Sequence, residues 1–127
     1  MKSRNVTLLI IIMMLLISCS EKIESPAVSA VERYYLAIIQ QSQDDLAKDV
    51  CSDFEATAKT ELDSYKGVKT ELSDFACTES DKSDQQATVK CTGKIVATYG
   101  NEKMDFPIEG RAHKVVNQSG DWLVCGY

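Results

Sequence analysis

The sequence predicts an α+β fold in which N-terminal helices pack on a curved four-stranded antiparallel sheet. Apolar residues follow the period of a helix from residue 27 to residue 65, and they alternate with polar residues, as in half-buried strands, from residue 86 onward. Helices therefore precede strands, instead of alternating with them as in a parallel sheet. The strand-like segments are short and separated by turn residues, which is typical of an antiparallel meander.

The first helix is expected over residues 27–41, because apolar side chains recur there at helical spacing. Ser25 suits the cap position before it, and Pro26 suits its first turn. The expected buried stripe consists of Val28, Val31, Tyr35, Ile38 and Ile39.

A second helix is expected to begin at Asp44 and Asp45, because acidic side chains are favourable at a helix N-terminus. The helical pattern continues, or restarts, over residues 56–65, and Gly67 is expected to end it. The apolar positions of this region are Leu46, Val50, Phe54, Ala58, Leu62 and Tyr65.

The clearest strand is expected over residues 86–99. Gly100 and Asn101 form the next turn, and a return strand follows, which Pro107 marks as an edge strand or a bulge. The expected inward positions are Ala87, Val89, Cys91, Gly93, Ile95, Ala97 and Tyr99 in the first of these strands, then Met104, Phe106, Ile108, Gly110 and Ala112 in the return strand.

Two further strands complete the predicted sheet. A first strand is expected over residues 68–77, with an alternation that slips near Ser73, and the charged stretch 78–84 closes its hairpin. A last strand is expected over residues 122–127, after a turn at residues 117–120.

Residues 1–18 have the layout of an export signal. Lys2 and Arg4 form a basic start, an apolar run over residues 6–17 follows, and the small Ser18 ends it. The run is shorter than the roughly 20 apolar residues with which a helix crosses a bilayer. We therefore expect a cleaved signal instead of an uncleaved membrane anchor.

The residues Leu16, Ile17, Ser18 and Cys19 resemble the bacterial lipobox, in which an aliphatic and a small residue precede a cysteine. The resemblance implies cleavage before Cys19, a thioether-linked diacylglycerol on its sulfur, and acylation of the new amino terminus. The alternative is an ordinary cysteine beside another kind of signal cleavage site. Such a site prefers a pair of small residues that this run does not supply.

The chain is then expected to consist of a signal (1–18), a lipidated cysteine with a short tether (19–26) and one domain (27–127). Ser20 stands where an aspartate would imply retention in the inner membrane of enteric bacteria. We therefore expect the outer membrane, facing the periplasm, in a host with two membranes. In any other host we expect the outer face of the cell membrane.

The charge balance is acidic, with 14 Lys and Arg against 19 Asp and Glu and a net charge of −5. Loss of the two cations Lys2 and Arg4 with the signal would lower it to −7. This argues against a nucleic-acid partner, which requires a basic surface, and against adhesion to anionic lipid headgroups. The lipid on Cys19 is therefore the expected contact with the membrane.

Four cysteines remain when Cys19 is set aside, namely Cys51, Cys77, Cys91 and Cys125. An even number in a small exported domain predicts two disulfides, for which three pairings are possible. Zinc is the alternative, but structural zinc ligands come as close pairs, which these spacings lack, and the chain has one histidine.

Two segments resemble the NTF2-like, or cystatin-like, superfamily: VERYY at residues 31–35 and GDWLV at residues 120–124. They look most similar to the small lipoprotein branch related to lumazine-binding-like domains of unknown function. The resemblance covers about residues 27–127 and implies a cone-shaped fold with a cavity between helices and sheet.

The predicted topology suggests one disulfide pairing. Cys77 and Cys91 are expected to lie opposite each other on paired strands, and Cys51, on the second helix, would then reach Cys125 on the last strand. The alternative joins Cys51 to Cys77 and Cys91 to Cys125.

His113 is expected at the surface of the return strand, on the face opposite Ala112. As a general base, as in NTF2-like dehydratases, it would need a polar partner inside the cavity. Asp105 shares its strand face but lies about 26 Å away along an extended chain. Four aromatic residues are expected to fill the core and its rim instead of lining a ligand pocket, namely Tyr34, Tyr35, Tyr99 and Trp122.

These observations predict a non-catalytic module of the cell envelope that presents an interaction surface to an envelope protein. No catalytic residue, cofactor or metal site is expected, and the acidic residues lack the spacing of a calcium loop. The alternative is a small-molecule carrier or an NTF2-like enzyme that uses the cavity. It would require a polar residue buried inside the cone, where the expected inward positions are apolar.

Overall fold

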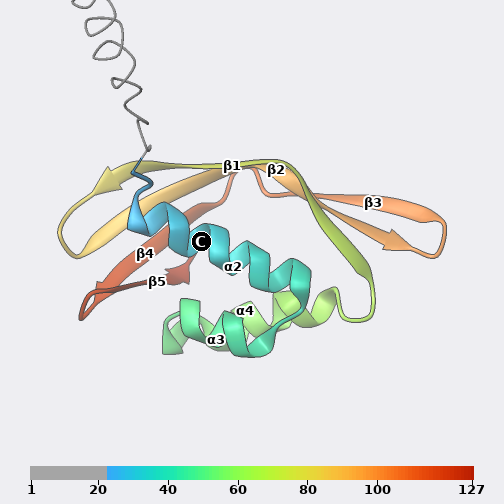
Figure 1. Ribbon diagram of the computed structural model, residues 1–127, viewed down its shortest axis with the longest axis horizontal. Helices are drawn as coiled ribbons and strands as arrows, with labels where there is room; N and C mark the ends of the chain where they lie inside the picture. The colour runs from blue at the N-terminus through green and yellow to red at the C-terminus, as the bar shows by residue number, and fades with distance from the viewer. Residues whose placement is uncertain (1–22) are drawn as a thin grey trace, which may run out of the picture.

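The computed structural model describes residues 23–127 (Figure 1). Three helices come first: α2 Pro26–Gln40, α3 Gln43–Asp49 and α4 Ser52–Ser64. The strands that follow are β1 Lys69–Lys82, β2 Gln86–Tyr99, β3 Glu102–Pro107, β4 Ala112–Gln118 and β5 Asp121–Gly126. The expected signal and Cys19 lie outside the described residues. No helix within these residues is both long and apolar enough to cross a bilayer.

All strand pairs of the sheet are antiparallel, and β2 is its central strand. One edge of β2 pairs with β1. The other edge pairs with β4 near the start of β2, at residues 86–90, and with β3 near its end, at residues 94–99. Strand β5 continues the sheet beyond β4. The expected fold class, helices on a curved antiparallel sheet, is confirmed.

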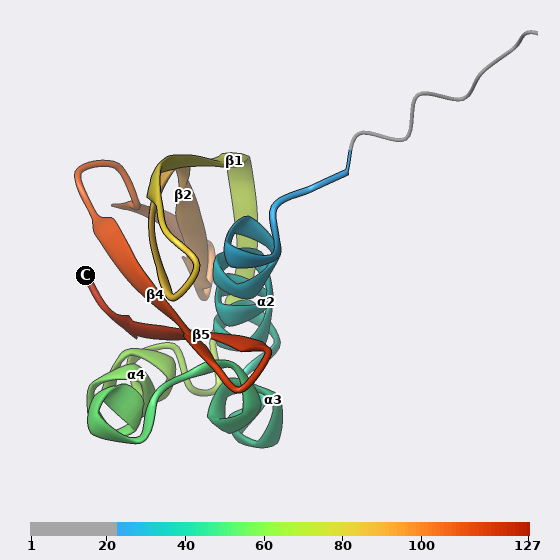
Figure 2. The same ribbon diagram turned by 90° about the vertical axis from the view of Figure 1, so that its left-hand side faces the viewer.

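The sheet curls around α2, which packs along its concave side, while α3 and α4 lie below (Figures 1 and 2). Apolar side chains of these layers form one core cluster. Its largest aliphatic members, each at most 2% exposed, are Val31, Ile38, Leu46, Leu62, Val89, Ile95, Ile108, Val115 and Val124.

The predicted return strand is divided into β3 and β4, so the sheet has five strands instead of four. Pro107, which has no N–H for a ladder, ends β3, and a turn at Gly110 with φ +89° separates it from β4. The turn reverses which residues point inward, so Ala112 is exposed and not buried as expected. Met104 is 51% exposed, because the hairpin of β2 and β3 projects beyond the helices (Figure 1).

The second helix is shorter than predicted. Ser42 caps α3, and the helix ends before Val50, which forms a parallel bridge with Val124 of β5. The N–H of Cys51 donates to the carbonyl oxygen of Val124 at 2.9 Å, and α4 begins directly after it. The chain thus leaves the helical conformation here because its backbone pairs with the sheet.

Strand β1 is longer than predicted and contains the irregularity that its pattern indicated. Its register against β2 shifts between Ser73 and Ala76, where Asp74 has a left-handed φ of +52° opposite Gly93. The strand continues through the charged stretch to Lys82, so the hairpin turn is confined to the residues before β2.

Candidate functional site

Polar side chains meet inside the cone, where the sequence predicted an apolar interior. Two come from adjacent positions of α2, one from α4, and the others from the segment before β4, from β4 itself and from the residue after β5. Three of them are fully buried, and the others approach the surface. This group, termed the interior cluster, consists of Tyr34, Tyr35, Glu61, Arg111, His113 and Tyr127.

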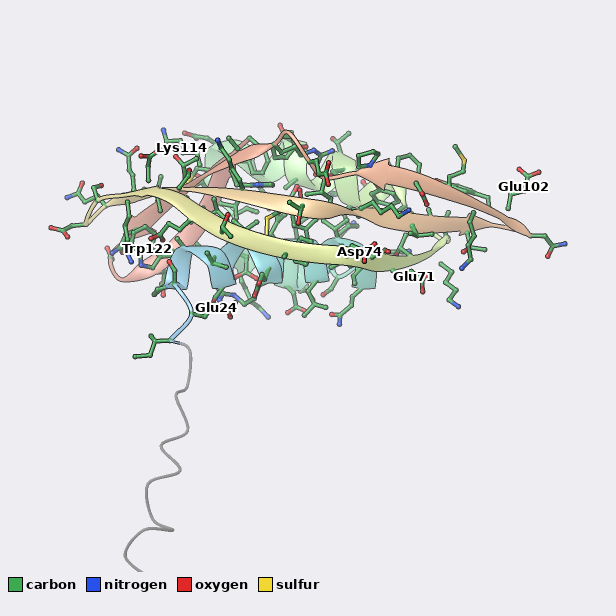
Figure 3. The ribbon with its side chains drawn as sticks, turned by 90° about the horizontal axis from the view of Figure 1, so that it is seen from above. Glu24, Glu71, Asp74, Glu102, Lys114 and Trp122 are labelled. Carbon is green, nitrogen blue, oxygen red and sulfur yellow. A yellow bond between two sulfur atoms is a disulfide. The ribbon has the colours of Figure 1, made fainter. Side chains whose placement is uncertain are left out.

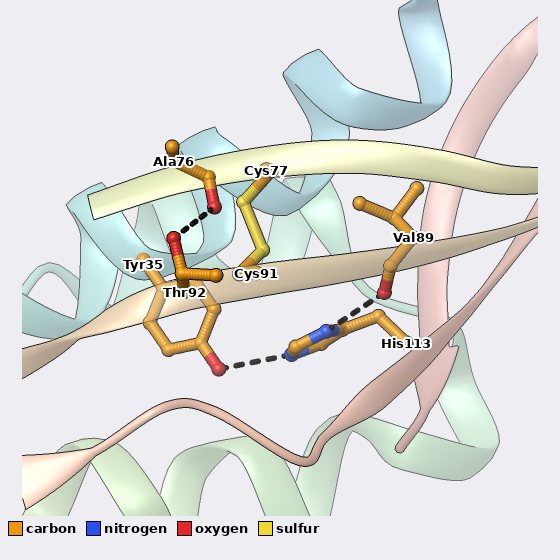
Figure 4. Close-up of a disulfide and its surroundings, with 7 residues drawn as sticks. All are labelled: Tyr35, Ala76, Cys77, Val89, Cys91, Thr92 and His113. Atoms are coloured by element: carbon orange, nitrogen blue, oxygen red, sulfur yellow. Dashed lines mark hydrogen bonds between the residues drawn. A yellow bond between two sulfur atoms is a disulfide. The ribbon is translucent and has the colours of Figure 1, made fainter.

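The innermost contact joins Tyr35 to His113 (Figure 4). Tyr35 Oη lies 2.9 Å from His113 Nε2, and His113 Nδ1 lies 3.3 Å from the carbonyl oxygen of Val89. A carbonyl oxygen only accepts, so in the neutral ring Nδ1 carries the proton and donates to Val89. Nε2 is then the acceptor for the Tyr35 hydroxyl, and both ring nitrogens are engaged.

Burial keeps this pair uncharged. Burial, assisted by the positive charge of Arg111, lowers the pKa of His113 from its ordinary 6.5 to about 4, although the hydrogen bond to Val89 acts in the opposite direction. Burial also raises the pKa of Tyr35 above its usual range. At neutral pH the imidazole is therefore a weak base, and the phenol is not ionised.

Glu61 joins the buried part of the cluster to the surface. Arg111 Nη1 lies 2.6 Å from Glu61 Oε1, and the hydroxyls of Tyr34 and Tyr127 both donate to Oε2. The Arg111 guanidinium also lies over the ring of Tyr127, 4.5 Å from its centroid. The side chain of Glu61 is 9% exposed and that of Arg111 is 32% exposed. The cluster therefore reaches solvent at Arg111 and Tyr127.

The charges of this rim are paired. Burial alone would lower the pKa of Arg111, but the Glu61 carboxylate raises it above its ordinary value. Burial and the same carboxylate raise the pKa of Tyr34, so this phenol stays protonated and donates. No buried side-chain nitrogen or oxygen of residues 23–127 lacks a hydrogen-bond partner. The buried polar atoms of the interior cluster thus all have hydrogen-bond partners within the protein.

The expectation that His113 lies at the surface is wrong, because its side chain is completely buried. The prediction assumed one continuous return strand, in which Ala112 points inward and His113 outward. The turn at Gly110 shifts the alternation by one residue, so His113 points inward instead. The residues after that glycine do not show the shift by their spacing, because Ala112 and Val116 are apolar as well as Val115. Asp105 pairs instead with Lys94 on the surface of the β2–β3 hairpin.

The four aromatic residues singled out in the sequence do not form one group. Tyr34 and Tyr35 belong to the interior cluster, with ring centroids 5.2 Å apart. Tyr99 is exposed at the end of β2. Trp122 is half-buried on β5, and Lys82 Nζ lies 5.8 Å from its ring centroid.

The cysteines pair as Cys77 with Cys91 and Cys51 with Cys125. Cys77 and Cys91 are direct partners in the register of β1 and β2 (Figure 4). Cys51 immediately precedes α4, instead of lying within a helix, and joins that end of the helices to β5. This is the first of the two arrangements considered from the sequence. Cys19 lies outside the described residues.

Five surface hollows of about 280–440 Å³ contain no residue of the interior cluster. One of about 440 Å³ lies between the start of α2, α3 and the β4–β5 turn, and Trp122 is among its lining residues. Arg33 Nε and Asp49 Oδ1 form an ion pair of 2.8 Å in its wall. Among residues 23–127, no three side chains gather as ligands of a metal ion.

Comparison with solved structures finds similar chains at low sequence identity. Rv3472 of Mycobacterium tuberculosis, a protein of unknown function, is 14% identical with a TM-score of 0.59, over 78% of this chain and 65% of that one. A candidate scytalone dehydratase of Novosphingobium aromaticivorans is 15% identical with a TM-score of 0.52, over 98% and 83%. The helical cell shape determining protein Pgp2 of Campylobacter jejuni is 11% identical with a TM-score of 0.50, over 77% and 38%.

This chain therefore spans less than two thirds of Rv3472 and of Pgp2. No family model and no curated protein matches it. Similarity at these identities shows the fold alone. Three helices on a strongly curled antiparallel sheet, shared with the scytalone dehydratase-like neighbour, show that the chain has the NTF2-like fold.

Proposed function

We propose that this chain is a lipid-anchored, non-catalytic module of the bacterial cell envelope that acts through its outer surface on an envelope protein. The basic and then apolar start of the sequence, the lipobox-like run ending at Cys19 and the even number of remaining cysteines support export and anchoring. We also propose that the chain belongs to the small lipoprotein branch that is related to lumazine-binding-like domains. It also includes the outer membrane, facing the periplasm, as the location in a host with two membranes.

One observation carries the non-catalytic part of the proposal: the interior cluster occupies the cone and satisfies its own polar atoms. A general base needs a pKa near the working pH and a free lone pair that points toward a substrate. His113 has a pKa of about 4, and its Nε2 accepts from Tyr35. The cone is thus built as a structural core, and a partner would meet the outer surface.

A second candidate function is supported by the same cluster. A histidine beside a tyrosine inside an NTF2-like cone is the buried polar pair that a carrier or an enzyme of this fold would require. Glu61 and Arg111 extend this pair toward solvent. In this alternative a ligand displaces Tyr127 and takes its place against Glu61 and Arg111.

The anchor is tested by growing cells with a labelled fatty acid. The chain with Cys19 should take up label, and the Cys19→Ala variant should not. Cys19→Ser is a second variant that keeps a small polar side chain but lacks the sulfur, so it should not take up label either. Label that persists in either variant would refute lipidation at Cys19.

The two functions are separated by a matched pair of variants. Met104→Asp changes an exposed side chain of the β2–β3 hairpin, and Tyr35→Phe removes one buried hydroxyl without changing the shape of the core. Cross-linking in intact cells should give one specific adduct, which Met104→Asp weakens and Tyr35→Phe preserves. Native mass spectrometry of the chain purified from envelopes should show no bound small molecule. A stoichiometric ligand that Tyr35→Phe releases would establish the cavity function instead.

A further inference from the structure

One end of the molecule carries the start of α2 together with two hairpin turns. The turn between β1 and β2 and the turn between β4 and β5 both lie there, and the β2–β3 hairpin forms the opposite end (Figures 1 and 3). The Ser25 hydroxyl, just before α2, donates to the Glu79 carboxylate near the end of β1. Glu24 and Trp122 line the same hollow at this end. The position where the chain enters the fold is therefore fixed against these turns.

The chain between the proposed lipid and this end is short. Pro26, the first residue of α2, follows Cys19 by seven residues. Seven residues span at most about 25 Å when fully extended, at roughly 3.5 Å each. The 14 residues of β2 alone extend over about 46 Å, at roughly 3.3 Å each. A lipid on Cys19 would therefore keep this end within about 25 Å of the bilayer, which is less than the length of β2 alone.

The side chains at this end suit the headgroup layer. Trp122 is the only tryptophan of the chain, and Lys82 Nζ lies 5.8 Å from its ring centroid. Tryptophan is enriched at membrane–water interfaces, where its ring is apolar and its N–H is a donor. The Lys82 ammonium also lies 4.0 Å from the Glu79 carboxylate, and its exposed side can meet a lipid phosphate. Lys114 lies at the same end, whereas the exposed Met104 belongs to the hairpin at the other (Figure 3).

We infer that the end formed by Trp122, Lys82 and the two turns faces the phospholipid headgroups, and that the β2–β3 hairpin points away from the membrane. This inference rests on the proposed lipidation of Cys19. The lipid supplies proximity, because an acidic chain does not adhere to an anionic bilayer by itself. Trp122 and Lys82 supply the orientation. The hairpin that is held outward is then the surface on which a partner arrives.

The single tryptophan makes this orientation measurable in the full-length acylated chain. The chain is reconstituted in vesicles of phosphatidylethanolamine and phosphatidylglycerol that contain a lipid with a nitroxide on its headgroup. Trp122 emission should be lost relative to vesicles without nitroxide. The matched control keeps Trp122 and adds a second probe at the opposite end with Tyr99→Trp, and the emission that this residue adds should be preserved.

The outcomes separate the orientation from the anchor. Intact mass first establishes whether the chain carries acyl groups, and a chain without them refutes the proposed anchor before any quenching is measured. An acylated, vesicle-bound chain whose Trp122 stays bright refutes the orientation while the anchor stands. Equal quenching at both ends does the same, since it means that the molecule lies flat. Quenching of Trp122 with a bright probe at residue 99 supports the orientation.

Discussion

The hydroxyl of Tyr35 on α2 lies 2.9 Å from Nε2 of His113 on β4, and the two residues are 78 positions apart in the chain. The contact is fully buried and joins the first helix to the middle of the sheet. Inside a protein such a bond is stronger than in water, and leaving one of its atoms unpaired is correspondingly costly. The stability of the cone should therefore depend on this pair more than on most single polar contacts.

Tyr35→Phe is expected to destabilise the fold by about 1–3 kcal/mol, because Nε2 of His113 would stay buried without a donor. The phenylalanine ring fills the same space, so no cavity adds to the loss. Urea unfolding followed by Trp122 fluorescence measures the change. Tyr99→Phe is the matched control, since Tyr99 is exposed, and it should leave the unfolding midpoint nearly unchanged. Equal midpoints for the two variants would contradict a structural role of the pair.

The folding stability should fall as the pH drops from about 6.5 to about 4. The pKa of His113 is about 4 in the folded chain, against an ordinary value of 6.5, so over this window the unfolded chain binds the proton and the folded chain does not. Stability from this group is complete above pH 6.5. It declines by at most about 3 kcal/mol in total and does not change further below pH 4.

Because His113 is the only histidine, its ring gives one assignable NMR signal. The signal should shift little between pH 8 and pH 5 in the folded chain, and it should titrate near pH 6.5 in urea. His113→Gln should remove this part of the pH dependence of unfolding. A folded-state titration near pH 6.5 would mean that the ring is hydrated, and would refute the buried neutral form.

The elements that the sequence identified well are those whose pattern is set by local spacing. The strand at residues 86–99 was predicted to the residue, because apolar and polar side chains alternate over most of β2, with Val96 as the exception. The first helix was predicted within one residue at each end for the same reason. The slip in β1 near Ser73 was also visible in the pattern and corresponds to the observed register shift.

The candidate site depends on breaks that spacing alone does not reveal. The turn at Gly110 sends His113 inward, and only the pairing of β4 with β2 makes this apparent. The end of α3 at Val50 follows from a bridge to β5, which lies more than 70 residues later. Glu61 looks like an ordinary exposed acid in its helix until Arg111 and Tyr127 are placed beside it. These contacts are long-range, and a single sequence carries no local sign of them.

The two disulfides should differ in how much they stabilise the chain. Cys51 and Cys125 are 74 residues apart and Cys77 and Cys91 are 14 apart, so chain entropy predicts about 4 and about 3 kcal/mol respectively. Replacing each pair by alanine, in separate chains, and measuring urea unfolding tests the order. Peptide mapping without reductant should find Cys51 linked to Cys125. A peptide that links Cys51 to Cys77 would contradict the pairing.

Gly93→Ala is expected to be far more damaging than Gly110→Ala, although the two glycines have similar φ angles of +94° and +89°. A Cβ at Gly93 would lie 2.6 Å from the carbonyl oxygens of Ser73 and Asp74, whereas a Cβ at Gly110 meets nothing within 4 Å. Both variants pay the strain of a left-handed backbone, about 1–3 kcal/mol. Gly93→Ala must in addition push the β1 bulge away from β2, which should cost roughly 1–3 kcal/mol more. Comparing their thermal unfolding isolates this second effect, and equal losses would mean that the close approach of β1 to Gly93 does not limit the fold.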